Sequence, residues 1–165
     1  MKYLIIYILF LFCGQQRYSQ ATNYFSIIKD TVRVPKENKV LNSEYIINTL
    51  KNGTTFQLIK ASNSKFYLRI VTSENLYFNK TDMLEIKSGS KSFFAKETTN
   101  FQLNKNTGYY FIEIYKNYIG TLKDEGITGL KFDKAITKYN KQDCNQIKQM
   151  AKFFYESFCV KNNIK

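Results

Sequence analysis

The clearest hydrophobic pattern in the chain lies near its C-terminus. Apolar residues recur there at steps of three and four, and Lys148, Lys152 and Glu156 fall between them. This is the pattern of an amphipathic helix, and Asn140 is well placed to cap its first turn. We therefore predict a helix over residues 141–160. Its apolar face consists of Cys144, Ile147, Ala151, Phe154 and Phe158.

The region before this helix shows the period-two alternation of half-buried strands. In Lys65 to Val71, the apolar side chains of Phe66, Leu68 and Ile70 alternate with polar or amphipathic ones. Ser88-Gly89-Ser90 forms a short hairpin connection. We predict an α+β protein that is mainly β, an antiparallel sandwich or partly open barrel with the C-terminal helix packed on it. The predicted strands cover residues 54–60, 65–71, 83–87, 91–96, 109–115, 127–132 and 135–139.

Two segments are ambiguous. Ser43 to Lys51 is either a short helix, with Ser43 as its cap and Glu44 in its first turn, or a strand, which its β-branched content allows. Asn117 to Glu125, which ends before Gly126, is a candidate for a helical turn, although Gly120 and the two acids at its C-terminal end weaken this prediction. We assign residues 22–52 to an N-terminal leader that holds the first of these segments. The β-rich domain is assigned to residues 53–165.

The N-terminus has the form of a secretory signal. Lys2 precedes an apolar run over residues 3–12, and Ser19-Gln20-Ala21 offers the small residues that signal peptidase requires. Ten apolar residues are too few to span a bilayer, which takes about 20. We predict a signal peptide over residues 1–21 and an exported, periplasmic or extracellular protein. The alternative is a lipid anchor on Cys13, which Phe12 disfavours because that cleavage also needs a small preceding residue.

The chain is strongly basic. Loss of Lys2 and Arg17 with the signal leaves 23 of the 25 basic residues against 13 acidic ones, a net charge of +10. Such a charge favours acidic partners, although the lysines are spread over the whole chain and form no block. An evenly basic, solvated surface is therefore the simpler interpretation, and a nucleic-acid or polyanion site is the alternative.

Cys144 and Cys159 are the cysteines that remain after the signal. On one unbroken helix, 15 residues separate them by about 22 Å. A disulfide needs about 4.4–6.8 Å between Cα atoms, so the two cannot pair within the chain. We expect two reduced, apolar thiols, with pairing between two molecules through Cys159 as the alternative.

The absence of histidine excludes Ser-His-Asp and Cys-His catalysis, histidine zinc sites and imidazole proton switches. No glycine-rich phosphate loop occurs, and we expect no metal or cofactor. Carboxylate chemistry is still open to Glu85, Glu97 and Glu113 on predicted strands, although acids in such places are usually solvated. No catalytic residue is assigned, and we lean against an enzyme.

Aromatic and cationic residues share predicted strand faces. Tyr67 and Arg69 alternate with the inward residues of their strand, and Phe111 and Tyr115 lie opposite Ile112 on theirs. Aromatic rings beside cations form a stacking surface for sugars or single-stranded nucleic acid. These four residues are our candidate ligand-binding residues. The alternative is that the other sheet and the C-terminal helix cover both faces, which would place them in the core.

The order of these segments resembles small exported proteins of unknown function from Bacteroidota. The resemblance is carried by Phe56 to Lys60, Phe66 to Val71, Met83-Leu84-Glu85-Ile86, residues 126–132 and residues 145–152. It implies a compact β-domain followed by a lysine-rich amphipathic helix and an address outside the cytoplasm. It also implies a helical turn before the last strands. It transfers no catalytic or binding residue.

The function we expect is an exported, non-enzymatic interaction or ligand-binding module. Its partner would be an envelope protein or an acidic polymer, and no membrane span would remain after signal removal. The alternatives are a carboxylate-based hydrolase acting on a glycan, and a nucleic-acid or polyanion binder. Two carboxylates about 5–10 Å apart in one pocket would favour the hydrolase.

Overall fold

The structure, a computed structural model, describes residues 25–35, 37–72, 84–95, 99–104, 107–132 and 135–160. The predicted signal over residues 1–21 and the alternative lipid site at Cys13 lie outside these residues. Glu97, one of the carboxylate candidates, also lies outside them.

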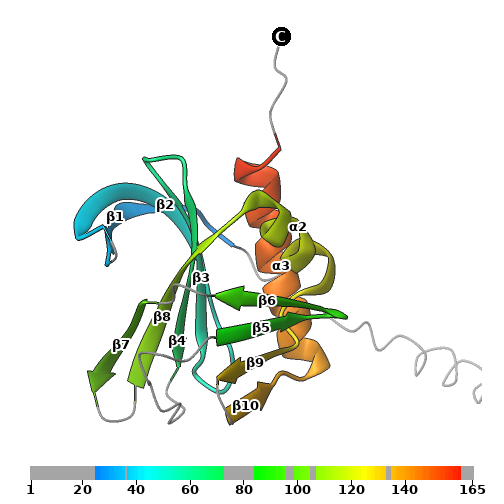
Figure 1. The fold of residues 1–165 in the computed structure, drawn as a ribbon. Helices are drawn as coiled ribbons and strands as arrows, with labels where there is room; N and C mark the ends of the chain where they lie inside the picture. Colours follow the sequence, from blue (N-terminus) through cyan, green and yellow to red (C-terminus); the bar gives the residue numbers. More distant parts are fainter. Residues whose placement is uncertain are drawn as a thin grey trace, which may run out of the picture.

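The described strands form two antiparallel sheets (Figure 1). The larger sheet has the order β1-β2-β3-β4-β8-β7, and the smaller sheet has the order β10-β9-β5-β6. The sheets do not close into a barrel. The predicted α+β class, mainly β with antiparallel strands, is confirmed. The strands of the larger sheet are β1 (Ile28–Val34), β2 (Lys39–Thr49), β3 (Thr55–Ala61), β4 (Phe66–Thr72), β7 (Thr99–Asn104) and β8 (Thr107–Ile114). Those of the smaller sheet are β5 (Leu84–Ser88), β6 (Lys91–Ala95), β9 (Gly129–Phe132) and β10 (Ala135–Lys138).

Two helices pack together on one side of the sheets, α2 (Lys116–Glu125) and α3 (Lys141–Phe158). The predicted C-terminal helix and the predicted turn before the last strands are both confirmed. Asn140 caps α3, because its Oδ1 accepts from the backbone N–H of Asp143 at 2.9 Å. Cys144 and Cys159 are both free, as the length of the helix requires.

The main core lies between the larger sheet, the smaller sheet and the helix pair. Leu58 lies opposite Leu68 in the pairing of β3 with β4, and Leu68 lies opposite Ile112 in the pairing of β4 with β8. All three are buried, together with Ile147 and Phe154 of α3. The period-two pattern of the sequence therefore places its apolar residues as predicted on this face of the sheet.

A second hydrophobic cluster lies on the other face of the larger sheet. It consists of Val34, Ile59, Ala61, Tyr67 and Phe111. Residues of β1 and β2 pack against it, and in Figure 1 the hairpin of these two strands bends away from the helices. Both faces of the central strands are thus apolar, which explains the near-continuous hydrophobic run of β3.

The N-terminal part of the chain differs from the prediction. Residues 39–49 form strand β2, so the strand alternative holds for most of Ser43 to Lys51 and the helix alternative is wrong. Strand β2 pairs with β1 on one side and β3 on the other, whereas a helix of nine residues has little stability of its own. The sheet therefore begins at Ile28, inside the predicted leader. Pro35 lies in the turn between β1 and β2, where its carbonyl accepts from the Asn38 N–H at 3.2 Å.

Candidate functional site

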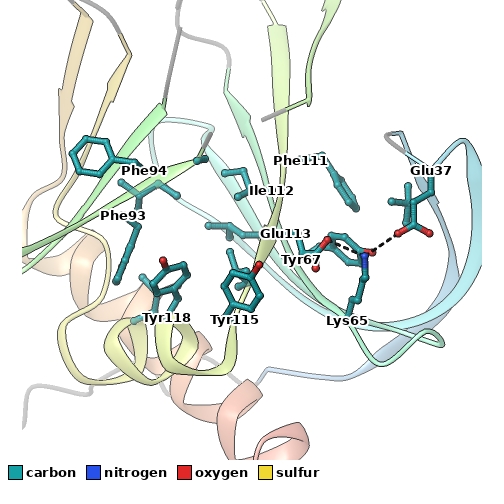
Figure 2. A pocket seen from close by; sticks show the side chains of 16 residues that line it. Glu37, Lys65, Tyr67, Phe93, Phe94, Phe111, Ile112, Glu113, Tyr115 and Tyr118 are labelled. Atoms are coloured by element: carbon teal, nitrogen blue, oxygen red, sulfur yellow. Dashed lines mark hydrogen bonds and ion pairs between the residues drawn. The ribbon is translucent and has the colours of Figure 1, made fainter. Parts of the chain in front are cut away.

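A groove of about 700 Å³ lies where the end of β8 meets β6 and α2 (Figure 2). This volume is in the range of small-ligand and peptide sites. Its floor is apolar and includes the buried side chains of Ile86, Ile112 and Leu122. One end is aromatic and the other carries charged side chains.

Consecutive residues of β6 and β8 line the groove. Its walls include Phe111–Ile114 of β8 with the following Tyr115, and Phe93–Ala95 of β6. Tyr67 and Leu68 of β4 also line it, and β4 pairs with both β3 and β8. The groove therefore contacts both sheets.

The aromatic end is formed by β6, the start of α2 and the residue before it. The rings of Phe93 and Tyr118 lie 4.5 Å apart between centroids, and those of Tyr115 and Tyr118 lie 5.9 Å apart. Phe94 is 56% exposed and Tyr115 is 64% exposed. Large exposed rings beside a groove are typical of binding surfaces.

The charged end is an ion triad. The Lys65 ammonium donates to Glu37 Oε1 and to Glu113 Oε2, each at 3.1 Å. The hydrogen bond to Glu113 makes the larger contribution and the one to Glu37 the next, and both raise the pKa of Lys65 above its usual value. Two carboxylates share one cation, so this end of the groove carries an excess negative charge in a strongly basic protein.

Three of the four candidate binding residues line this groove. Tyr67, Phe111 and Tyr115 are part of its wall, and Arg69 is not. Arg69 lies over the ring of Tyr109, at 4.7 Å from its centroid. Their binding role stays a prediction.

The prediction that Tyr67 and Phe111 form an open outward surface is wrong. They are only 2% and 5% exposed, and their rings lie 5.0 Å apart within the second hydrophobic cluster. The core alternative holds for these two residues, but the covering side chains come from β1 and β2 and not from the helix. Burial raises the pKa of the Tyr67 hydroxyl, which accepts a hydrogen bond from the Asn63 amide at 3.2 Å.

The carboxylate candidates are separated. Glu113 lies in the groove, whereas Glu85 accepts from the Ser92 hydroxyl at 2.7 Å in the β5–β6 pair. Sequence reasoning missed Glu37, Phe93 and Phe94. Glu37 lies in the turn after β1, within the predicted leader. Phe93 and Phe94 were missed because alternation alone does not predict that β6 lies across the groove from β8.

The described residues contain no group of three histidine, cysteine or acidic side chains that would hold a metal ion. The two thiols also lack an activating environment. Burial raises the pKa of Cys144, and the neighbouring charge of Asp143 adds to the effect. Burial likewise raises the pKa of Cys159.

Fold and groove together define a two-sheet β-domain with a helix pair and a groove between β6, β8 and α2. Comparison with protein-family models, curated proteins and solved structures finds no significant match to this chain. The resemblance to exported Bacteroidota proteins therefore stays a prediction.

Proposed function

We propose that this protein is a non-enzymatic binding module whose ligand lies in the groove between β6, β8 and α2. The observation that carries the proposal is the combination of one groove, exposed rings at one end and an ion triad at the other. An apolar floor with a few convergent polar groups is the usual composition of a ligand site.

The charge of the groove does not favour a polyanion. Glu37 and Glu113 outnumber Lys65 at its charged end, so a phosphate or sulfate chain would meet excess negative charge there. The overall basic charge supports a general attraction to acidic surfaces, which is not specific to this groove. The ligand that fits is apolar or aromatic and carries neutral or basic polar groups.

A glycan hydrolase is the second candidate, and the two groove carboxylates favour it. Glu37 Oε1 and Glu113 Oε2 each lie 3.1 Å from the same nitrogen, so they are at most 6.2 Å apart. Retaining glycosidases have separations of about 5–5.5 Å. However, Lys65 lies between the two groups, and neither is enclosed in the apolar environment that keeps a general acid protonated.

Release of reducing ends from soluble cell-wall glycans tests the hydrolase. Glu113→Gln would abolish the activity, and Glu44→Gln would leave it unchanged. Glu44 is a matched control because it also pairs with two lysines, Lys29 and Lys60, away from the groove. We expect no release by any of the three proteins.

We also propose that the protein acts outside the cytoplasm. The signal-like sequence of residues 1–21 supports this proposal. Among the residues that the structure describes, no helix has the length and apolar character needed to cross a membrane. Fractionation of the native host tests the address, and recovery of the chain in the cytosol with Met1 intact would contradict it.

Titration with Nile red, an uncharged dye that fluoresces in apolar sites, tests the binding proposal. We expect saturable binding to the protein that begins at residue 22. Replacing the exposed rings by Phe94→Ser with Tyr115→Ser should weaken binding about tenfold, because it removes apolar contact area from the groove.

The control is Val40→Ser with Ile136→Ser. These two side chains are 64% and 55% exposed and lie outside the groove. The control variant should bind the dye like the parent, and thermal unfolding should show that both variants fold. Equal binding by parent and groove variant would contradict the proposal.

A further inference from the structure

The smaller sheet has one face in the main core and the other in solvent. In β5, Leu84 and Ile86 are buried in the main core, whereas Glu85 and Lys87 between and after them are partly exposed. The register of the four strands continues this alternation across the sheet. We call the exposed side of β5, β6, β9 and β10 the outer face. It carries Glu85, Lys87, Phe94, Lys131, Ile136 and Lys138.

Three lysines of the outer face surround a glycine. Lys87 and Lys138 lie directly opposite Gly129 on the two neighbouring strands, and Lys131 lies two positions further along β9. Strands are about 4.8 Å apart, so the backbones at Lys87 and Lys138 are about 10 Å apart across a position without a side chain. Lysine stems are long and flexible, so the three ammonium groups can reach one anion placed over Gly129.

The positive charge of the outer face exceeds its negative charge. Among its described side chains Glu85 is the only acid, and its carboxylate accepts from the Ser92 hydroxyl at 2.7 Å. Three lysines and one carboxylate give this part of the face a net charge of +2. Such a face attracts an anionic partner. The ion pairs between described residues involve other lysines, namely Lys29, Lys60, Lys65, Lys123 and Lys152.

Two large apolar side chains share the outer face. Phe94 is 56% exposed on β6 and Ile136 is 55% exposed on β10, the first and last strands of the smaller sheet. They end one row of the register, whose middle positions are Glu85 and Lys131. Exposed apolar side chains beside lysines are typical of surfaces that bind anionic membranes, because the apolar groups enter the headgroup region and the lysines contact phosphates.

We infer that the outer face docks on an anionic lipid surface. Lipid phosphates lie among Lys87, Lys131 and Lys138, and the side chains of Phe94 and Ile136 enter the headgroup region. This inference goes beyond the proposed function, because the outer face is a different surface from the groove and shares only Phe94 with it.

The same observations disfavour other anionic or apolar partners. A free phosphate or an acidic polymer would contact the lysines and gain nothing from the two apolar side chains. A second copy of the chain would bring three identical lysines against the first three, because a symmetric dimer pairs one patch with itself. Like charges repel, so this contact is unfavourable.

Co-sedimentation with lipid vesicles tests the inference. The protein begins at residue 22, so that the apolar run over residues 3–12 does not contribute. Vesicles of phosphatidylcholine are compared with vesicles in which about a third of the lipid is phosphatidylglycerol. We expect at least about tenfold tighter binding to the anionic vesicles, weakening with added salt. Equal binding to both vesicles, or binding to neither, would overturn the inference.

Two matched triple variants separate the outer face from the general basic charge of the protein. Each removes three positive charges, and the control set consists of exposed lysines elsewhere. The face variant should bind anionic vesicles at least about thirtyfold more weakly, and the control less than about threefold, because only lysines near the surface contribute strongly. Equal losses would overturn the inference. The two sets are Lys87→Gln, Lys131→Gln and Lys138→Gln on the face, and Lys39→Gln, Lys51→Gln and Lys148→Gln elsewhere.

The apolar contact is tested by Ile136→Ser, with Val40→Ser as its control. Val40 is 64% exposed on β2 of the larger sheet. Ile136→Ser should weaken binding to anionic vesicles about fivefold, and Val40→Ser should leave it unchanged. Equal affinities of these two variants would indicate a site for charge alone and overturn the lipid surface.

Soluble glycerol phosphate distinguishes a lipid surface from a free phosphate. It carries the phosphate ester of the lipid headgroup without a bilayer. We expect millimolar glycerol phosphate to leave the protein on the anionic vesicles, because it cannot replace the contact of Phe94 and Ile136 with the headgroup region. Full displacement at this concentration would assign the lysines to a soluble phosphate and overturn the inference.

The two binding proposals fail independently. Nile red is titrated without vesicles, so Val40→Ser with Ile136→Ser should keep dye binding and lose vesicle affinity. Tyr115→Ser should weaken dye binding and keep vesicle affinity, and thermal unfolding should show that all variants fold. Dye binding without vesicle binding would overturn the lipid surface and leave the groove. Vesicle binding without dye binding would do the reverse.

Discussion

At the residue scale, Gly126 occupies the tightest backbone position between α2 and α3. Its φ is +71°, and a Cβ atom there would lie within 2.4 Å of the Cys144 carbonyl oxygen. Gly126→Ala must therefore separate the end of α2 from the first turn of α3, besides adopting a conformation that L-residues avoid. We expect a loss of about 2–4 kcal/mol in the free energy of unfolding, measured by urea denaturation. A loss below about 0.5 kcal/mol would show that the two helices do not approach as closely as described.

Gly120 is the matched opposite case. It lies inside α2, and a Cβ atom there would meet only Tyr155 Cε2 at an ordinary 3.8 Å. Glycine costs a helix interior about 0.5–1 kcal/mol relative to alanine. Gly120→Ala should therefore raise the free energy of unfolding by about that amount in the same urea experiment. A destabilised variant would contradict the described environment.

At the scale of elements, the start of α3 depends on a reciprocal cap. Asn140 accepts from the Asp143 N–H at 2.9 Å and donates from Nδ2 to Asp143 Oδ2 at 2.7 Å. Asn140→Ala removes both bonds and should cost about 1 kcal/mol in the free energy of unfolding. Asn140→Ser restores an acceptor and should recover part of that loss. A negligible loss in Asn140→Ala would show that the cap contributes nothing.

The two cysteines are expected to stay reduced. Cys159 is 3% exposed at the C-terminal end of α3, and burial raises the pKa of both thiols. The thiolate is the reactive form, so both groups should react with a thiol reagent at pH 8 much more slowly in the folded protein than in denaturant. Non-reducing electrophoresis should show a monomer, and a disulfide-linked dimer would support the alternative pairing through Cys159.

Most elements could be predicted from the sequence because their apolar residues follow the period of the element. This holds for α3, whose apolar face repeats at three and four residues, and for β4, where Phe66, Leu68 and Ile70 alternate with other residues. β7 was missed, although Phe101 and Leu103 alternate with Asn100 and Gln102 in the sequence. β1 and β2 fall in the predicted leader. These two strands are stabilised by pairing with each other and with β3, and the hydrophobic period of one segment does not indicate its pairing partners.

The site could be predicted only in part for the same reason. Alternation correctly places Tyr67 and Phe111 opposite the main core, but it does not predict that β1 and β2 supply a second apolar cluster. Glu37, Lys65 and Glu113 come from three separate parts of the chain, and only the tertiary fold brings them within hydrogen-bonding distance. The groove lies between β6 of the smaller sheet and β8 of the larger one, and which strands meet there is a property of topology.

At the scale of the whole molecule, two apolar layers share the central strands, and each contains a buried tyrosine. Tyr110 is fully buried in the main core, and Tyr67 is 2% exposed in the second cluster. Burial raises the pKa of both hydroxyls above the usual value. Ionisation of either group therefore requires the layer around it to open.

The alkaline stability of the protein follows from these two tyrosines. In the unfolded chain a tyrosine ionises near pH 10, whereas the folded protein keeps Tyr67 and Tyr110 neutral to higher pH, so the unfolded state binds fewer protons above this value. The free energy of unfolding should therefore be unaffected by these groups below pH 10 and fall above it, by at most about 1.4 kcal/mol per pH unit for each tyrosine that is still neutral in the folded protein. Urea denaturation between pH 8 and 11.5 measures this slope. Tyr110→Phe should make the slope shallower whatever its effect at pH 7, and an unchanged slope would mean that Tyr110 ionises without the core opening.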